Sequence, residues 1–368
     1  MLSAQQQEFF STTDCESSLA WRSNVSKTRE LLATLRQILS GEGTVSLEFG
    51  ADDAWRLSVE GIIFSDRRFL GSYQPLGRVN GVRPGVALGI LTGGKVRFRR
   101  DSTAAVSCGQ SSFLLPVNVG SAPVHAPPKP FALGDLNWIE QALVSAEFCL
   151  VRPGGQFSAA SSWLGAIIGP VRNWRFHVIV DSQLLRRALR AGPYFEYAFT
   201  PARLWMYGKY LSCEIPGESR RPAFDPSPLV GKVQSYPIRI EVDGGACTRW
   251  GEIYKYLTVE IATDGLIIRD NRKQIRLAGE PAGSSAVKQW RVRSRPLLYA
   301  LSRGERANVY LPERKLDPIG IECGGRWMWI LAEGDNPPSV GRAATGGLLN
   351  VNSLRTTNGT PVASFPFI

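Results

Sequence analysis

The chain has 368 residues, of which 43% are hydrophobic and 20% charged, a composition typical of soluble globular domains. A chain this long usually forms two or three domains. Its formal net charge of +11 favours a polyanionic partner, with nucleic acid first. The longest uncharged apolar run, residues 161–171, is interrupted by two glycines and a proline, which excludes a membrane-spanning helix. The beginning of the chain does not resemble a signal peptide, so we expect a cytoplasmic protein.

The first predicted element is an amphipathic helix over residues 26–39. Its apolar face consists of Leu31, Leu32, Leu35, Ile38 and Leu39. Ser26 is suited to cap the start of this helix and Gly41 to follow its end. Arg29 and Arg36 lie seven residues apart on a shared face, away from the leucines. Strands are predicted next, at 44–49 and 55–59.

Two proline-rich stretches divide the chain, at 117–136 and 214–230, each with four prolines. Proline at this density blocks helix interiors and central strands, so both stretches are predicted to be extended connections. The predicted organisation is an N-terminal extension at 1–22, domains at 23–116, 137–216 and 231–332, linkers at 117–136 and 217–230, and a tail at 333–368.

The ends of the three domains share one spacing. An Ala–Leu pair occurs in each, at Ala87-Leu88, Ala188-Leu189 and Ala300-Leu301. An alternating strand begins seven residues after each leucine, at Lys95, Glu196 and Asn308. Three matches in the same order indicate an internal repeat whose unit is a short helix followed by two or three strands.

The front halves of the three domains are less alike. The second has a candidate helix at 137–146. In the third, candidate strands at 257–262 and 266–269 flank Asp264-Gly265, a strong signal for a two-residue hairpin turn.

Catalytic chemistry has little support in this sequence. The two histidines, His125 and His177, have no evident partners for a triad or a metal site. The sequence has no phosphate-binding glycine motif in the right context, and its carboxylates are scattered. The six cysteines are far apart, without a CxxC pair, and are interpreted as reduced, mostly buried thiols. We therefore expect no enzyme activity, no cofactor and no bound metal.

Basic residues follow the predicted helices more regularly. Charged side chains on one helix face are ordinary, but equivalent basic faces in repeated units would align along one surface. Such a surface suits phosphate contacts that do not depend on base sequence. The predicted DNA-contacting residues are Lys27, Arg29, Arg36, Arg186, Arg187, Arg190, Arg295, Arg303 and Arg306.

The closing stretch from Trp290 through Asp317-Pro-Ile-Gly-Ile321 to Trp327-Met-Trp-Ile-Leu331 resembles the end of the third domain of bacterial sliding clamps, the beta subunits of the replicative DNA polymerase. Ala262-Thr-Asp-Gly265 resembles the recurring hairpin of that family, and the second linker lies where the family joins its second and third domains. The resemblance covers about residues 24–332. The strongly basic charge departs from the family, whose members are usually acidic.

The resemblance implies an α+β fold of three repeated DNA-clamp-like domains, each with sheets outside and short helices inside. It implies a homodimeric ring that encircles double-stranded DNA, acts as a processivity factor in DNA replication, and tethers a DNA polymerase or another clamp-binding protein. It also implies a pocket for partner peptides between the second and third domains. The candidate pocket residues are Pro226, Pro228, Trp327, Trp329 and Leu331.

Two other interpretations fit the same sequence. One is a β-rich structural or assembly protein of a virus or mobile element, which binds nucleic acid through a basic surface. The other is an RNA-binding or single-strand-binding protein that forms no ring. A specialised phage or mobile-element clamp, or a relative that binds DNA without closing a ring, would also account for the excess of basic residues.

Overall fold

The computed structural model contains mixed helix and strand, and it describes only part of the chain. The described residues are 20–23, 29–40, 43–66, 75–98, 103–118, 128–172, 174–218, 225–249, 255–270, 272–284, 288–302, 306–315 and 317–332. Contacts between Cα atoms divide the chain into two compact units. One consists of Met1–Lys129, Ala188–Tyr194 and Trp205–Ile215, and the other of Pro130–Arg187, Phe195–Leu204 and Pro216–Ile368.

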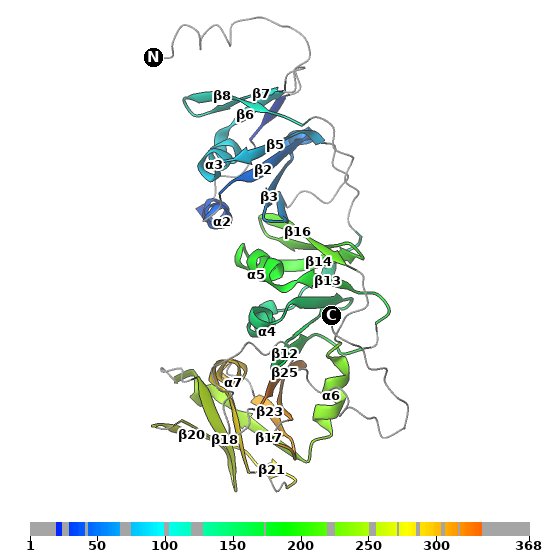
Figure 1. Cartoon of the computed structure of the whole chain (residues 1–368), viewed down its shortest axis with the longest axis vertical. Helices are drawn as coiled ribbons and strands as arrows, with labels where there is room; N and C mark the ends of the chain where they lie inside the picture. The colour runs from blue at the N-terminus through cyan, green and yellow to red at the C-terminus, as the bar shows by residue number, and fades with distance from the viewer. Residues whose placement is uncertain are drawn as a thin grey trace, which may run out of the picture. The chain divides into compact units, whose positions relative to one another are not determined.

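We keep the names first, second and third repeat for the segments that the sequence predicts to be repeated. The first repeat has two helices and two groups of strands. Its elements are β1 (Ala20–Arg22), α2 (Arg29–Leu39), β2 (Val45–Gly50), η1 (Ala51–Asp53), β3 (Trp55–Val59), β4 (Ile62–Asp66), β5 (Pro75–Val82), α3 (Pro84–Gly93), β6 (Lys95–Phe98), β7 (Thr103–Cys108) and β8 (Ser111–Pro116). The strands predicted at 44–49 and 55–59 are confirmed as β2 and β3. Helices α2 and α3 lie together on one side of the sheet of β2, β3 and β5 (Figure 1).

The second repeat follows a similar order. Its elements are β9 (Phe131–Ala132), η2 (Leu136–Ile139), α4 (Glu140–Ser145), β10 (Phe148–Arg152), β11 (Gln156–Ala160), β12 (Leu164–Ile168), β13 (Val178–Asp181), α5 (Ser182–Arg190), β14 (Tyr194–Thr200), β15 (Arg203–Gly208) and β16 (Leu211–Glu218). The helix predicted at 137–146 is confirmed in position, although its first turn, η2, is a 3₁₀ helix.

The third repeat begins with a helix that was not predicted. Its elements are α6 (Ser227–Gln234), β17 (Ile238–Asp243), η3 (Gly244–Arg249), β18 (Tyr256–Ala262), β19 (Gly265–Arg269), β20 (Gln274–Ala278), β21 (Pro281–Ala282), β22 (Gln289–Arg293), α7 (Ser294–Leu301), β23 (Arg306–Leu311), β24 (Pro318–Cys323) and β25 (Arg326–Leu331). Helix α6 starts inside a stretch predicted to be extended. That prediction is wrong there because Pro228 lies in the first turn, where proline costs no helical hydrogen bond.

The three Ala–Leu pairs fall in α3, α5 and α7, the helix that precedes the last three strands of each repeat. The strand predicted at Lys95 begins there as β6, whereas β14 and β23 each begin two residues earlier than predicted. The Asp264-Gly265 hairpin is confirmed, because β18 and β19 pair antiparallel with Ala262 opposite Gly265. The predicted α+β fold class is therefore confirmed.

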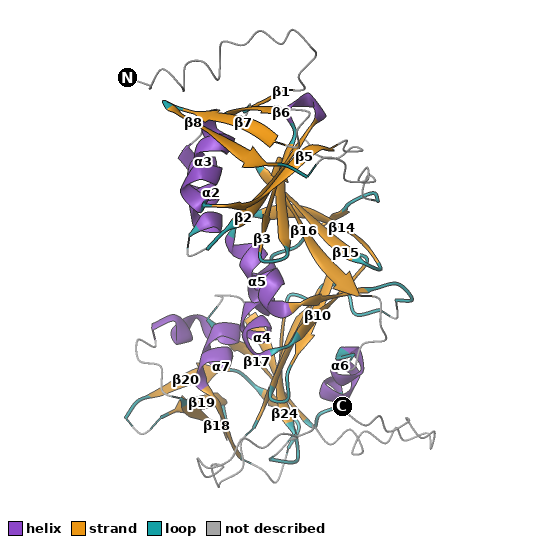
Figure 2. Ribbon diagram, turned by 45° about the horizontal axis from the view of Figure 1, so that its top comes forward, coloured by secondary structure: helices purple, strands orange, loops and turns teal. Residues whose placement is uncertain are grey.

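One continuous run of paired strands joins the second and third repeats. Strand β12 pairs antiparallel with β25, with Gly165 opposite Trp329. Strands β24, β23 and β17 extend the same sheet beyond β25. Helices α7 and α6 lie on opposite sides of these strands, as the second view makes clear (Figure 2). The third repeat also has a separate four-stranded sheet in the order β20-β19-β18-β22.

Within the unit that holds the first repeat, a buried ion triad links two strands far apart in sequence. The guanidinium of Arg56 on β3 lies 2.6 Å from the carboxylate of Glu214 on β16 and 3.4 Å from that of Glu48 on β2. Strand β16 pairs with β4, which places Glu214 opposite Ile63.

Across the described residues, no helix is long and apolar enough to span a bilayer.

Candidate functional site

Helix α2 presents the predicted separation of apolar and basic faces. Leu31, Leu35, Ile38 and Leu39 are buried. Arg29 and Arg36 are exposed, as the sequence predicts. Lys27 and the predicted cap residue Ser26 lie outside the described residues, as does Gly41.

An acidic residue also occupies the exposed side of α2. The Tyr210 hydroxyl donates a hydrogen bond to the Glu30 carboxylate, and Lys209 Nζ lies 3.8 Å from it. The Tyr210 hydrogen bond, followed by the charge of Lys209, holds the pKa of Glu30 below its usual range. Glu30 is therefore anionic at neutral pH, and it offsets part of the charge that Arg29 and Arg36 contribute.

Helix α5 carries the predicted group of three arginines. Asp181 caps its start, because its carboxylate accepts a hydrogen bond of 2.8 Å from the backbone N–H of Gln183. Leu185 and Ala188 are buried on one face. Arg190 is exposed, whereas Arg186 and Arg187 are half-buried. Burial lowers the pKa of Arg187 from its ordinary value. Because that ordinary value is far above neutral pH, the guanidinium remains cationic at pH 7.

Helix α7 provides less of its predicted basic face. Arg295 is exposed on the helix, and Arg303 lies outside the described residues. The placement of Arg306 on the same helix face is wrong, because α7 ends at Leu301 and Arg306 begins β23. Its guanidinium lies 3.2 Å from the carboxylate of Glu241 on the neighbouring strand.

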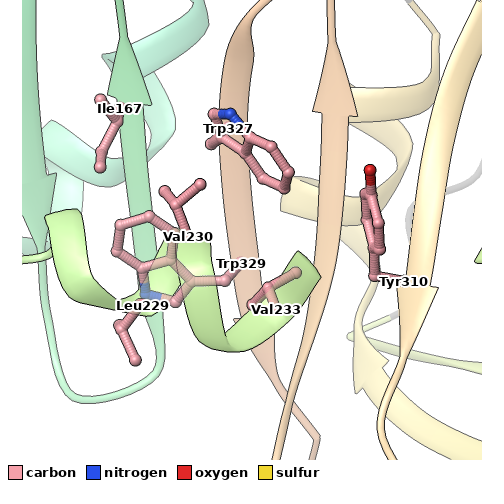
Figure 3. Close-up of a cluster of buried hydrophobic side chains, with 7 residues drawn as sticks. All are labelled: Ile167, Leu229, Val230, Val233, Tyr310, Trp327 and Trp329. Carbon is pink, nitrogen blue, oxygen red and sulfur yellow. The ribbon is translucent and has the colours of Figure 1, made fainter. Parts of the chain in front are cut away.

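The second candidate site is a cluster of buried apolar side chains beside α6. Figure 3 shows α6 in front of β25, with Ile167 on the strand to one side and Tyr310 on the strand to the other. Trp327 and Trp329 are two residues apart on β25, so their side chains lie on the same face of the strand. They are 7% and 3% exposed, respectively. We call this group the α6 cluster; it consists of Ile167, Leu229, Val230, Val233, Tyr310, Trp327 and Trp329.

Two glycines allow the α6 cluster to pack so closely. A Cβ atom at Gly165 would stand 2.0 Å from the indole of Trp329, and one at Gly320 would stand 2.1 Å from the side chain of Val233. Any larger residue at either position would overlap its neighbour. The tryptophan on β25 and the helix α6 therefore both rest directly on strand backbone.

An ion pair and hydrogen bonds connect the start of α6 to the second repeat. Buried Arg152 on β10 donates a hydrogen bond of 2.7 Å to the Ser227 hydroxyl and forms an ion pair with Asp225. Asp225 in turn accepts a hydrogen bond of 2.9 Å from the Ser227 backbone N–H. Burial alone would raise the pKa of Asp225, but the hydrogen bonds from Arg152 and Ser227 outweigh it and hold that pKa below its usual range.

The structure brings only part of the predicted peptide site together. Trp327 and Trp329 belong to the α6 cluster, but Leu331 does not, and its backbone N–H instead bonds the carbonyl of Trp163. Pro226 is buried where α6 begins, and Pro228 is exposed on the helix. Sequence reasoning missed the apolar residues of α6 itself. The spacing of Leu229, Val230 and Val233 is compatible with one face of a short helix, but the neighbouring prolines indicate a linker and obscure that signal.

The described part of the chain contains no grouping of His, Cys, Asp and Glu able to hold a metal ion. None of the cysteines that the structure describes is joined in a disulfide. Cys149, Cys213, Cys247 and Cys323 are buried and Cys108 is half-buried. The prediction of reduced, mostly buried thiols is confirmed for these five.

Comparison with solved structures places this fold among the bacterial DNA sliding clamps. A crystal structure of the Bacillus subtilis DNA polymerase sliding clamp aligns with a TM-score of 0.59 and 12% identity, over 87% of this chain and 100% of that one. The DNA polymerase III beta subunit of Pseudomonas aeruginosa aligns with a TM-score of 0.57 and 10% identity, over 86% of this chain and 100% of that one. Similarity at such low identity shows the fold.

A third solved structure is the Helicobacter pylori beta clamp bound to a DNA ligase peptide, with a TM-score of 0.56 and 12% identity over 86% of this chain and 100% of that one. No family model matches the sequence, and no curated protein matches it. The likeness is thus one of architecture, and it confirms the resemblance seen in the sequence: this chain has the fold of the DNA polymerase III beta clamps, in a divergent form.

Proposed function

We propose that this protein is a DNA sliding clamp, which encircles duplex DNA as a ring of two chains and tethers a partner that works on DNA. The observation that carries the proposal is the fold, because the three clamp structures above are each covered in full by this chain. A clamp of this kind performs no chemistry. It confines a partner to DNA topologically, so that weak contacts which permit sliding are sufficient.

Exposed arginines on the repeat helices support contact with duplex DNA. Arg29 and Arg36 on α2, Arg190 on α5 and Arg295 on α7 present guanidinium groups to solvent. Such groups contact phosphates without reading base sequence. The net charge of +11 favours the same partner.

An edge strand of the first repeat supports a dimer. Strand β8 forms one end of the sheet β1-β6-β7-β8, and Leu114 on it is 45% exposed. An apolar edge strand is a common site for pairing with another chain. We propose that β8 pairs with the edge strand β20 of the third repeat in a second copy, so that both sheets continue across the interface. Two such contacts would close the ring.

We place the partner-peptide site at the α6 cluster. The H. pylori structure is that of a clamp bound to a DNA ligase peptide. In this chain Trp327 and Trp329 fill the space beneath α6, so a peptide would bind either across α6 or after the indoles move.

Electron microscopy of the purified chain tests the proposal most directly. We expect particles with the mass of two chains and a central hole wide enough for duplex DNA. Larger shells or filaments would instead favour a structural or assembly protein, and an open monomer would favour a DNA-binding relative without a ring.

A topological assay tests function separately. The protein is incubated with nicked circular DNA and isolated with it at a salt concentration that abolishes binding to short duplexes. We expect retention on the circle and loss after a single restriction cut. Equal retention on circular and linear DNA would contradict encirclement.

A further inference from the structure

A hollow of about 660 Å³ lies on the four-stranded sheet of the third repeat. Its lining comes from β18 and the residue before it, from β19 and the turn that follows it, and from β22. The lining residues are Lys255, Tyr256, Leu257, Thr258, Arg269, Asp270 and Arg291. Neither the helix faces nor the α6 cluster includes any of these residues.

Strand register brings the cations of the hollow together. Thr258 on β18 pairs with Arg269 on β19 on one side and with Arg291 on β22 on the other. Adjacent strands lie about 4.8 Å apart, so the two arginines flank the threonine on one face of the sheet. Val259 on β18 and Val292 on β22, which lie next to Thr258 and Arg291 along their strands, are buried on the opposite face. The hollow is therefore on the solvent side of the sheet.

The positive charge of the hollow is only partly neutralised. The guanidinium of Arg291 lies 4.9 Å and the ammonium of Lys255 lies 5.2 Å from the centre of the Tyr256 ring. An aromatic ring holds a cation in place without cancelling its charge. In the described parts of the chain, neither Lys255 nor Arg291 forms an ion pair, whereas Arg269 lies 3.1 Å from Glu260.

One carboxylate also lines the hollow. Asp270 Oδ1 accepts backbone hydrogen bonds from Arg272 and from Lys273, the latter 2.8 Å long. These bonds tie Asp270 into its own turn, so that it shapes the β19–β20 connection. Three cations thus face one carboxylate, whose Oδ1 atom has these partners and whose Oδ2 atom has none among the described residues.

Basic residues continue over the sheet beyond the hollow. Arg272, Lys273 and Arg276 are exposed on and before β20, and Lys288 is exposed before β22. Arg276 is paired with Asp264, but the other three form no ion pair among the described residues. The whole face therefore favours an extended anion over a single small one.

We infer that this hollow binds the phosphodiester backbone of a single DNA strand. Each arginine guanidinium can donate two parallel hydrogen bonds to phosphate oxygens, and the lysine ammonium can form an ion pair with them. The Thr258 hydroxyl supplies a further hydrogen-bond donor between the arginines. Three adjacent strands span about 10 Å, a width that suits a single sugar–phosphate backbone. The lining exposes more polar than apolar surface, which suits phosphate better than an apolar peptide.

This inference goes beyond the proposed clamp function and does not depend on it. The hollow lies on the face of this four-stranded sheet opposite the buried side chains Val259, Trp290 and Val292. A strand bound there would occupy residues other than those proposed to contact duplex DNA. The protein would then hold a duplex and a separated strand at different places.

Fluorescence anisotropy with a labelled 15-nucleotide deoxythymidine strand tests the inference on the full chain. We expect a variant with Lys255→Gln, Arg269→Gln and Arg291→Gln to bind at least ten-fold more weakly. The slope of log affinity against log salt should fall by about 2, because each phosphate that is no longer neutralised lowers it by about 0.7. The matched control removes the same charge from exposed residues of the first repeat, with Arg78→Gln, Lys95→Gln and Arg97→Gln, and should change affinity less than three-fold.

Three results would overturn the inference. Equal losses in the two variants would mean that only overall charge matters. An equal loss for a labelled duplex would mean that the hollow does not select single strands. Competition by thymidine monophosphate as effective, per phosphate, as competition by the 15-mer would assign the hollow to a free nucleotide.

Photocrosslinking gives a local readout that does not require a substituted protein. A strand carrying 5-iododeoxyuridine is irradiated with the unmodified chain, and the adducts are mapped by mass spectrometry. We expect an adduct on Tyr256, and adducts only at other sites would contradict the inference. Neither measurement involves ring closure, so failure of the clamp proposal and failure of this inference are separately visible.

Discussion

The indole of Trp329 on β25 lies against the backbone of Gly165 on β12, so closely that a Cβ atom on Gly165 would stand 2.0 Å from the ring. Trp329 is 3% exposed, so its ring is enclosed by neighbouring atoms. We therefore expect Gly165→Ala to destabilise the chain by about 1–3 kcal/mol, the usual cost of overpacking a core. Urea unfolding followed by tryptophan fluorescence measures the change.

The matched control is Gly231→Ala in α6, on the other side of the same cluster. A Cβ atom there would meet nothing within 4 Å. At an exposed helix position, alanine is more favourable than glycine by up to about 1 kcal/mol. The free energy of unfolding of this variant should therefore be unchanged or slightly higher. If both alanines destabilise equally, the close contact at Gly165 is not the cause.

Elements defined by local pattern could be predicted from the sequence. The hairpin at Asp264-Gly265 follows from its turn residues, and the buried face of α2 follows from its leucine spacing. Helix α6 could not be predicted in the same way, because Pro226 and Pro228 indicate a linker unless the helix is known to begin between them. The Trp329–Gly165 contact depends on the pairing of strands from different repeats, which no local pattern specifies.

The candidate sites likewise contain some residues whose positions could be predicted from the sequence and others whose positions could not. Arg36 and Arg190 could be placed by helical periodicity, and both are exposed as expected. Arg306 could not, because its position depends on where α7 ends. The hollow on the third repeat was not foreseen, since Arg269 and Arg291 become neighbours only through the register of β18 with two other strands.

Loss of the carboxylate that pairs with Arg152 should destabilise the link between the second and third repeats. The Arg152 side chain is almost fully buried, so Asp225→Asn leaves a buried guanidinium without its counter-charge. The Asp225 side chain is 38% exposed, and solvent therefore screens the pair. We expect a loss of about 1–3 kcal/mol at pH 7, measured by urea unfolding. Asparagine retains the shape and the bond to Ser227, so a loss near zero would show that the charge is unimportant.

The same pair predicts a pH dependence. The folded chain holds the pKa of Asp225 below its usual range. A carboxyl with a lowered pKa stabilises the fold above its unfolded value, about 3.9, and this contribution is lost as pH falls through the folded value. The stability difference between the unmodified chain and Asp225→Asn should be constant above about pH 5 and shrink below about pH 4. A difference that grows in acid would contradict this assignment.

Reversal of charge on α5 should weaken duplex binding. With Arg186→Glu, Arg187→Glu and Arg190→Glu, the helix would no longer neutralise up to three phosphates, so the slope of log affinity against log salt should fall by about 3. Anisotropy with a labelled duplex measures both affinity and slope. Three reversals on exposed strand residues of the first repeat, Arg78→Glu, Lys95→Glu and Arg97→Glu, control for overall charge. Unchanged duplex binding in the α5 variant would remove this helix from the DNA-contacting surface.

An edge-strand substitution tests the proposed dimer. Leu114 on β8 is 45% exposed, and Val144 on α4 is 43% exposed, so the two differ mainly in whether they lie at a sheet edge. Lysine on an edge strand opposes pairing with another chain because its charge must be buried. We expect Leu114→Lys to convert the dimer to a monomer in analytical ultracentrifugation, with thermal stability at high dilution little changed. Val144→Lys should leave the dimer intact. A Leu114→Lys chain that remains dimeric would place the interface elsewhere, and with it the closure of the ring.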